Sequence, residues 1–130
     1  MTAISNLGVE LDIVIMRGAT LVLNLTCTDP TSDPPNGPKS LDGCTLRAQI
    51  RKAGLSGESL ADFTPEITDV VNGKATLTLN SAQTAELVAG ESADDPISQY
   101  VWDLELTDAH GVVSFPAYGT VSVFRQVSKP

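Results

Sequence analysis

Four stretches of the chain alternate apolar and polar residues with a period of two. They cover residues 19–27, 44–51, 74–79 and 100–107. The apolar side of the fourth stretch consists of Tyr100, Trp102, Leu104 and Leu106. Successive side chains of a β-strand point to opposite faces, so the pattern predicts strands with one buried and one solvated face. A helix would need apolar residues three and four positions apart, and these stretches lack that spacing.

Shorter runs predict further strands. The run at 10–16 and the run at 19–28 predict two strands in succession or one strand bent at Gly18. Residues 60–64 predict a short strand that ends at Pro65.

A hairpin and a final strand are expected further along the chain. Asn72-Gly73 is a strong signal for a two-residue hairpin turn, because both positions tolerate positive φ. Residues 112–124 are interrupted by Pro116 and Gly119, which predicts either two pieces joined by a bulge or an edge strand.

Residues 80–89 change to a helical period. Asn80 or Ser81 can cap the first turn, and Gly90 can end the helix. The apolar stripe consists of Ala82, Ala85, Leu87 and Ala89. We therefore expect one short helix, at about 81–89, that crosses between sheets.

Seven or eight short strands with one small helix predict an all-β protein, an antiparallel β-sandwich. The 130 residues, of which 42% are hydrophobic, suit a single domain spanning 1–130. The expected core comprises Leu21, Leu23, Leu25, Leu46, Ile50, Leu77, Leu79, Trp102, Leu104 and Val121.

Three segments are expected to lie outside the sandwich. Residues 29–43 are rich in Pro, Gly, Asp and Ser, which predicts a long surface loop, and both contact with a partner and simple disorder remain open for it. Residues 1–9 and 126–130 lack strong local patterns, so we expect flexible termini that become ordered on assembly.

The formal net charge is −8, with only 8 Lys and Arg residues, which argues against binding of nucleic acid. The first ten residues lack a targeting signal, and no apolar run reaches the roughly 18–20 residues that span a bilayer. We expect a protein made and folded in the cytoplasm, without contact to a membrane. Cys27 and Cys44 flank the long loop, where a disulfide is geometrically feasible, but free thiols are favoured in that compartment.

The sequence predicts no enzyme and no catalytic, cofactor-binding or metal-binding residue. The single histidine, His110, lies in a predicted turn without an indicated partner, and no Gly-x-Ser-x-Gly motif occurs. Two loops hold several carboxylates, at Asp29, Asp33, Asp42, Asp94 and Asp95. Their spacing does not match a calcium loop, and Cys27, Cys44 and His110 are too few for structural zinc.

Two sets of strand residues could bind a ligand but are expected to be structural. Trp102, with Tyr100 and Leu104, could form a platform for a sugar, yet such a set is more often the core of a sandwich. Arg47 and Arg51 share the solvated face of their strand, where pairing with carboxylates of a neighbouring strand is expected.

Several segments together resemble small immunoglobulin-like proteins of tailed bacteriophages, including the N-terminal domain of siphophage baseplate upper proteins. The segments are LRAQIRKAG (46–54), GKATLTLNSAQTAEL (73–87), YVWDLELTDAHGVV (100–113) and YGTVSV (118–123). The turn Arg17-Gly18-Ala19-Thr20 and the segment Leu41-Asp42-Gly43 also match. The chain departs from the pattern in its proline-rich insertion at 29–40 and in Ser-Phe-Pro-Ala-Tyr at 114–118.

The resemblance implies an immunoglobulin-like sandwich that serves as a virion structural protein. Its location would be the tail, baseplate, fibre attachment or neck, after assembly in the host cytoplasm. Its partners would be other virion proteins, and it would be present in multiple copies. The alternatives are a capsid decoration (cement) protein and a carbohydrate-binding or adhesion module, although the aromatic content of 5% is low for the latter.

Overall fold

Short strands and one helix make up the part of the chain that this computed structural model describes, namely residues 2–5, 8–29, 34, 37–52, 60–87 and 97–124. The first six strands are β1 (Thr2–Ser5), β2 (Val9–Glu10), β3 (Ile13–Met16), β4 (Leu21–Asp29), β5 (Gly37–Pro38) and β6 (Thr45–Lys52). The remaining elements are β7 (Ala61–Asp62), β8 (Thr64–Asp69), β9 (Lys74–Leu79), α1 (Ser81–Ala85), β10 (Ile97–Thr107) and β11 (Val113–Phe124).

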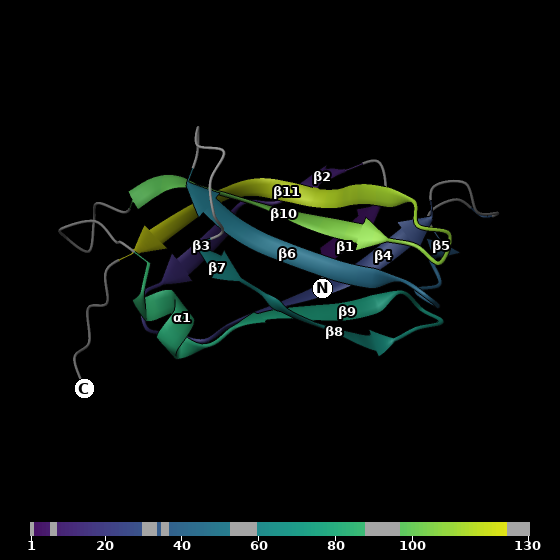
Figure 1. The fold of residues 1–130 in the computed structure, drawn as a ribbon, viewed down its shortest axis with the longest axis horizontal. Helices are drawn as coiled ribbons and strands as arrows, with labels where there is room; N and C mark the ends of the chain where they lie inside the picture. Colours follow the sequence, from purple (N-terminus) through teal and green to yellow (C-terminus); the bar gives the residue numbers. More distant parts are fainter. Residues whose placement is uncertain are drawn as a thin grey trace.

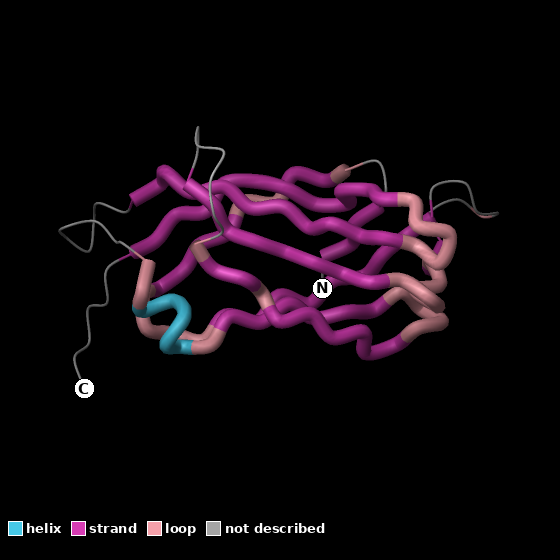
Figure 2. Tube along the Cα trace, in the orientation of Figure 1, coloured by secondary structure: helices cyan, strands magenta, loops and turns pink. Residues whose placement is uncertain are grey.

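The strands form two sheets that pack against each other (Figure 1). The first sheet has the order β1-β4-β9-β8, with β5 added to β4, and the second has the order β2-β11-β10-β6-β7, with β3 added to β11. Figure 2 shows the helix at one end of the sandwich and many of the turns at the other. The prediction of an all-β sandwich with one short helix is confirmed, but the described residues form eleven strands rather than seven or eight, because several are only two to four residues long.

The expectation of purely antiparallel pairing is wrong for the first three strands. β1 runs parallel to β4, whereas β2 and β3 run parallel to β11. The N-terminal segment first extends the first sheet and then crosses to the second. Residues 1–9, expected to be a flexible terminus, therefore contain β1 and the start of β2.

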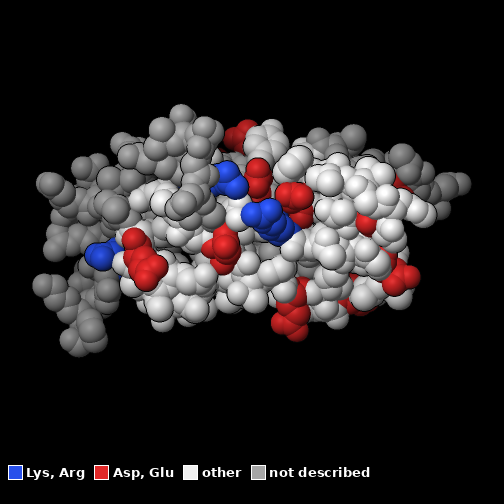
Figure 3. Space-filling view, viewed as in Figure 1, with Lys and Arg blue, Asp and Glu red and all other residues white. Residues whose placement is uncertain are grey.

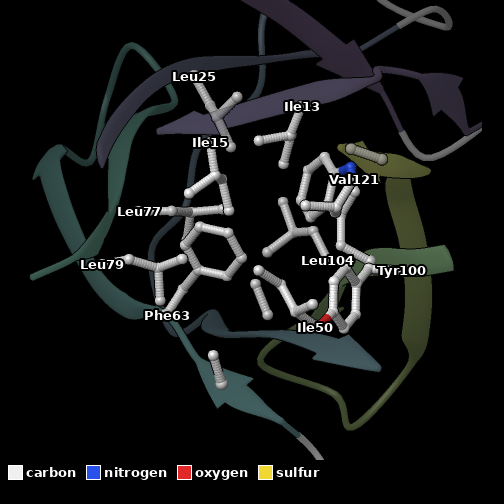
Figure 4. Close-up of a cluster of buried hydrophobic side chains, with 14 of the residues drawn as sticks. Ile13, Ile15, Leu25, Ile50, Phe63, Leu77, Leu79, Tyr100, Leu104 and Val121 are labelled. Carbon is white, nitrogen blue, oxygen red and sulfur yellow. The ribbon is translucent and has the colours of Figure 1, made fainter. Parts of the chain in front are cut away.

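The core lies between the sheets and contains most of the predicted residues (Figure 4). Those confirmed as buried are Leu25, Ile50, Leu77, Leu79, Trp102, Leu104 and Val121. Leu21, Leu23 and Leu46 are only partly buried, which corrects the prediction. Among the described residues, β1 pairs with β4 only from Leu25 onward and β7 pairs with β6 only near Ile50. No described strand therefore pairs with the outer edge of β4 or β6 beside these three leucines.

The helix is shorter than predicted. Asn80 caps it as expected, in a capping box in which its side chain accepts a hydrogen bond from the backbone N–H of Gln83 at 2.8 Å. The helix ends at Ala85, because Glu86 and Leu87 donate to carbonyls three residues earlier. The predicted stripe is wrong at Ala82, which is exposed. Thr84 is buried instead, and its hydroxyl donates to the Ala19 carbonyl at 2.8 Å. Ala89 and Gly90 lie outside the described residues.

Three turn and strand predictions need correction. Pro65 does not end a strand but lies within β8, which tolerates it because β8 is at the edge of its sheet. The β8–β9 turn spans residues 70–73 rather than two residues, because the carboxylate of Asp69 accepts hydrogen bonds from the backbone and the side chain of Asn72. The final strand, β11, is continuous and lies inside its sheet, so it is neither interrupted nor an edge strand. The predicted irregularity at Pro116 is confirmed, because the register with β10 shifts between Ser114 and Ala117.

Part of the proline-rich loop joins a sheet, contrary to expectation. β4 continues to Asp29, and β5 pairs with its end in an antiparallel arrangement. Residues 30–33, 35–36 and 126–130 lie outside the described residues, so the predictions for those parts of the loop and for the C-terminus are not addressed.

Candidate interaction surface

Large and charged side chains gather on the outer face of the second sheet, where β2, β11, β10 and β6 lie side by side. We name this surface the tyrosine face and define it by Glu10, Arg47, Gln49, Arg51, Val101, Asp103, Tyr118 and Thr120. Strand register places these residues in rows across the sheet. One row runs Glu10, Tyr118, Asp103 and Gln49, and the next contains Thr120, Val101 and Arg51.

A shallow groove crosses the middle of the tyrosine face. Its volume is about 350 Å³, and its apolar lining residues include Tyr118, Val101 and the largely buried Trp102. Tyr118 and Val101 are 47% and 37% exposed, respectively. Glu10, Asp103 and Thr120 line the same groove, so two carboxylates and a hydroxyl border an exposed aromatic ring.

A crossover between β2 and β3 fixes the edge of this face. The indole Nε1 of Trp102 donates to the carbonyl of Leu11 at 2.7 Å, and the backbone N–H of Leu11 donates to the carbonyl of Tyr118 at 2.7 Å. Gly119 makes this approach feasible, because a Cβ at that position would overlap the Leu11 carbonyl. The crossover thereby ties the strand that carries Glu10 to the strand that carries Tyr118.

Asp12 holds the same crossover from the outside. Its Oδ1 accepts hydrogen bonds from the backbone N–H of Thr120 at 3.1 Å and from the Thr120 hydroxyl at 2.9 Å. These donors, the backbone N–H first, lower the pKa of Asp12 below its usual value of 3.8. The carboxylate therefore stays ionised in mildly acidic solution.

The basic side chains lie on the opposite side of the face, on β6. Arg51 Nη2 donates to Gln49 Oε1 at 2.6 Å, and Gln49 Nε2 donates to Asp62 Oδ1 at 3.0 Å. Arg47 and Glu105 are cross-strand neighbours in the register. Figure 3 shows blue and red side chains next to one another near the middle of the view, where β6 crosses in Figure 1. The prediction that Arg47 and Arg51 share the solvated face is confirmed.

His110 lies exposed in the turn between β10 and β11, as predicted. Asp108 shapes this turn, because its Oδ1 accepts hydrogen bonds from the backbone N–H groups of Val112 at 3.0 Å and His110 at 2.8 Å. These bonds, that of Val112 first, lower the pKa of Asp108. The hydrogen bonds that involve Asp108 and His110 organise the backbone of the turn.

The predicted loop carboxylates are not brought together within the described residues. Asp29 ends β4 and Asp42 lies in an exposed turn, whereas Asp33, Asp94 and Asp95 lie outside the described part. Among described residues, no three His, Cys, Asp or Glu side chains lie close enough to hold a metal ion. Within the same residues, no helix has the length and apolar content needed to cross a membrane.

Cys27 and Cys44 are both free thiols. Cys27 is buried in the core, and burial raises the pKa of its thiol to about 11. Cys44 is partly buried, and burial raises its pKa as well. Both thiols are therefore protonated near neutral pH.

The structure distinguishes the two interpretations of Tyr100, Trp102 and Leu104 on β10, namely core residues or a platform for a sugar. Tyr100, Trp102 and Leu104 are buried, so the interpretation of this set as core is confirmed and the sugar platform is excluded at these residues. Phe63 packs against Trp102, with ring centroids 6.0 Å apart. Sequence reasoning missed Tyr118, although alternation with the buried Val121 and Val123 indicates the outward side of β11.

No protein-family model matches the chain, and no curated protein matches it in sequence.

Proposed function

We propose that this chain is a structural protein of a bacteriophage virion, located in the tail, baseplate, fibre attachment or neck, and that it acts by protein–protein contacts. The phage setting is supported by the resemblance of residues 46–54, 73–87, 100–113 and 118–123. These segments contribute to β6, β9, β10 and β11, which include the central strands of the second sheet. The proposal includes multiple copies in the particle and excludes nucleic acid and membrane as partners.

The finer description of the fold as immunoglobulin-like is part of this proposal. In that fold, strands A, B, E and D form one sheet, and C, F and G form the other. The order β1-β4-β9-β8 corresponds to A-B-E-D, and β6, β10 and β11 correspond to C, F and G. The parallel β1 and the small helix between β9 and β10 are departures from that plan.

The observation that carries the proposed contact function is the composition of the tyrosine face. Aromatic residues and arginine are enriched at protein interfaces, and an exposed apolar groove with a charged border suits a protein partner. Tyr118 and Val101 are the exposed apolar residues of the groove, whereas Glu10 and Asp103 lie at its border and Arg51 nearby.

A capsid decoration protein is an alternative that differs only in where the chain sits on the particle. A carbohydrate-binding or adhesion module is favoured by one observation, namely the exposed ring of Tyr118 beside the carboxylate of Asp103. Aromatic rings stack on sugars and carboxylates accept hydrogen bonds from their hydroxyls. Glycan-array binding that is lost in Tyr118→Ala would support this alternative over the structural role.

Quantitative mass spectrometry of purified virions tests the proposal. Particles of a phage that encodes the chain are separated from the lysate on a density gradient and digested. We expect peptides of the chain at several copies per particle, as for tail or baseplate proteins. A chain that is abundant in the lysate but absent from purified particles would contradict the proposal. Enrichment in tail-less capsids would favour the decoration alternative.

A further inference from the structure

The chain contains two Asn-Gly dipeptides, at residues 36–37 and 72–73. An asparagine that precedes glycine readily loses its side-chain amide, because glycine has no side chain to hinder attack by its own backbone nitrogen. Asn36 lies outside the described residues, whereas Asn72 is exposed in the β8–β9 turn and Gly73 is buried. The structure therefore shows the surroundings of the second dipeptide.

Two hydrogen bonds tie Asn72 to Asp69. Asp69 Oδ2 accepts from Asn72 Nδ2 at 2.8 Å, and Asp69 Oδ1 accepts from the Asn72 backbone N–H at 3.2 Å. These bonds, that of the side chain first, lower the pKa of Asp69, so its carboxyl group is ionised near neutral pH. The carboxylate therefore holds the nitrogen atom that loss of the amide would release.

We propose that Asn72 is a site of spontaneous conversion to aspartate and isoaspartate, and that the carboxylate of Asp69 slows this conversion in the folded protein. The Gly73 N–H loses its proton to a solvent base, and the nitrogen forms a bond to Asn72 Cγ. The Cγ–Nδ2 bond then breaks and ammonia leaves, which closes a succinimide ring. Water opens the ring at Cγ to give aspartate, or at the main-chain carbonyl carbon to give isoaspartate. The site is independent of the proposed virion role.

The negative charge of Asp69 opposes both charged steps of this reaction. The deprotonated Gly73 nitrogen carries a negative charge, and so does the oxygen on Cγ after the attack. A carboxylate within hydrogen-bond distance of Nδ2 repels both charges. The hydrogen bond from Nδ2 also holds the side chain in one orientation and must break before ammonia leaves.

Packing holds Gly73 from the other side and determines what conversion would change. A Cβ at this position would overlap the carbonyl oxygens of Cys27 and Lys39. The Gly73 carbonyl accepts a hydrogen bond from the Cys27 N–H at 2.7 Å, and the Cys27 carbonyl accepts one from the Lys39 N–H at 3.0 Å. Isoaspartate lengthens the main chain by one carbon directly before Gly73. We therefore expect the converted chain to hold Lys39 less firmly against β4.

Peptide mass spectrometry of the full, folded chain over a time course in mildly alkaline buffer tests the proposal. The conversion rate at residue 72 is divided by the rate at the same residue in the urea-unfolded chain, and residue 36 is treated in the same way. Each asparagine thus has its own reference, and digestion in acid prevents conversion during handling. We expect Asn72 to convert in the folded chain at least about tenfold more slowly than in urea.

Substitution of Asp69 tests the role of the carboxylate. Asp69→Ala should speed conversion at Asn72 in the folded chain at least about threefold and leave the rate at Asn36 unchanged. Asp108→Ala is the matched control, because Asp108 shapes a different turn through the same kind of hydrogen bonds. Asp69→Asn keeps an acceptor for the Asn72 N–H but removes the charge, and it should also speed conversion. Thermal unfolding checks that each variant is folded.

Three outcomes would overturn the proposal. They are a folded wild-type chain that gives no product at residue 72, an unchanged rate at Asn72 in both Asp69 variants, and an equal acceleration by Asp108→Ala. The last outcome would attribute the change to general loosening. Amide hydrogen exchange tests the structural consequence in the converted chain, which ion exchange separates by its added negative charge. Exchange at Lys39 should be faster than in the unconverted chain, and equal exchange would contradict the expected loosening.

Discussion

The outer faces of the two sheets obey the same alternation but carry different side chains. The first sheet presents what we name the threonine face, consisting of Val22, Asn24, Thr26, Thr64, Glu66, Lys74, Thr76 and Thr78. Threonine is common in strands because its branched side chain fits a pleated surface, so strand formation alone accounts for this composition. Both faces carry charges of both signs, but the tyrosine face also exposes an aromatic ring, which strand formation does not require. We therefore interpret the threonine face as a solvated surface and the tyrosine face as a surface suited to contact with another protein.

The largest expected effect concerns the core that supports both faces. Trp102 is 3% exposed and packs against Phe63. Trp102→Ala should lower the free energy of unfolding by about 3–5 kcal/mol, because it leaves a cavity. Urea denaturation measures this loss. A nearly neutral substitution would show that the interior does not depend on this side chain.

Trp102→Phe sharpens the comparison, because it affects the crossover beside the tyrosine face more than the threonine face. Phenylalanine fills part of the volume but cannot donate to the Leu11 carbonyl. We expect the free energy of unfolding to fall by about 1–3 kcal/mol. Relative to the wild-type chain, amide hydrogen exchange should accelerate more at Leu11 than at Asn24. Equal acceleration at both residues would mean that the indole hydrogen bond does not hold the crossover.

The architecture could be predicted from the sequence, whereas the N-terminal crossover could not. Strands such as 74–79 and 100–107 show long alternation, and the structure contains them with the expected faces buried. β1 and β2 are too short to show a period, and their pairing depends on β4 and β11, which are remote in sequence. The crossover depends on the absence of a Cβ at Gly119, which a sequence pattern presents only as an interruption.

A smaller effect is expected from pH at the edge of the tyrosine face. The pKa of Asp12 is lowered in the folded protein, so its contribution to stability is present above the usual value of 3.8 and is lost as the pH falls through the folded pKa. Asp12→Asn should therefore flatten the dependence of stability on pH in the acidic range.

Thr120→Val is the matched control for this pH effect. It removes the hydroxyl donor to Asp12 but keeps the backbone donor, so the carboxyl pKa should rise only part of the way to its usual value. NMR titration of the Asp12 carboxyl measures this shift. An unchanged titration in Thr120→Val would show that the hydroxyl does not stabilise the carboxylate.

The smallest effect is expected at the thiols, which lie on neither face. Cys44 is partly exposed and Cys27 is 1% exposed, so iodoacetamide should modify Cys44 first. The reaction should be slow, because burial raises the pKa of both thiols and the thiolate is the reactive form. Peptide mass spectrometry over a time course measures the two rates. Equally fast modification of Cys27 would contradict the buried position.

The tyrosine face was only partly predictable from the sequence, because it combines residues from strands that are remote in sequence. Arg47 and Arg51 could be assigned to the solvated side of a clear alternation. Tyr118 was missed because Pro116 and Gly119 interrupt the pattern around it, although the alternation with Val121 and Val123 holds the signal for its outward side. The role of Glu10 depends on the parallel pairing of β2 with β11, which places its side chain next to Tyr118. Strand order, rather than local sequence, creates this surface.

Incorporation of two matched variants into virions tests the central claim most directly. Tyr118→Glu changes the tyrosine face and Asn24→Glu changes the threonine face, and each is supplied in place of the wild-type chain during phage growth. If the tyrosine face makes the contact, purified particles should contain Asn24→Glu at wild-type copy number and little or no Tyr118→Glu, with both variants folded in solution. Equal incorporation of the two variants, or selective loss of Asn24→Glu, would contradict the account.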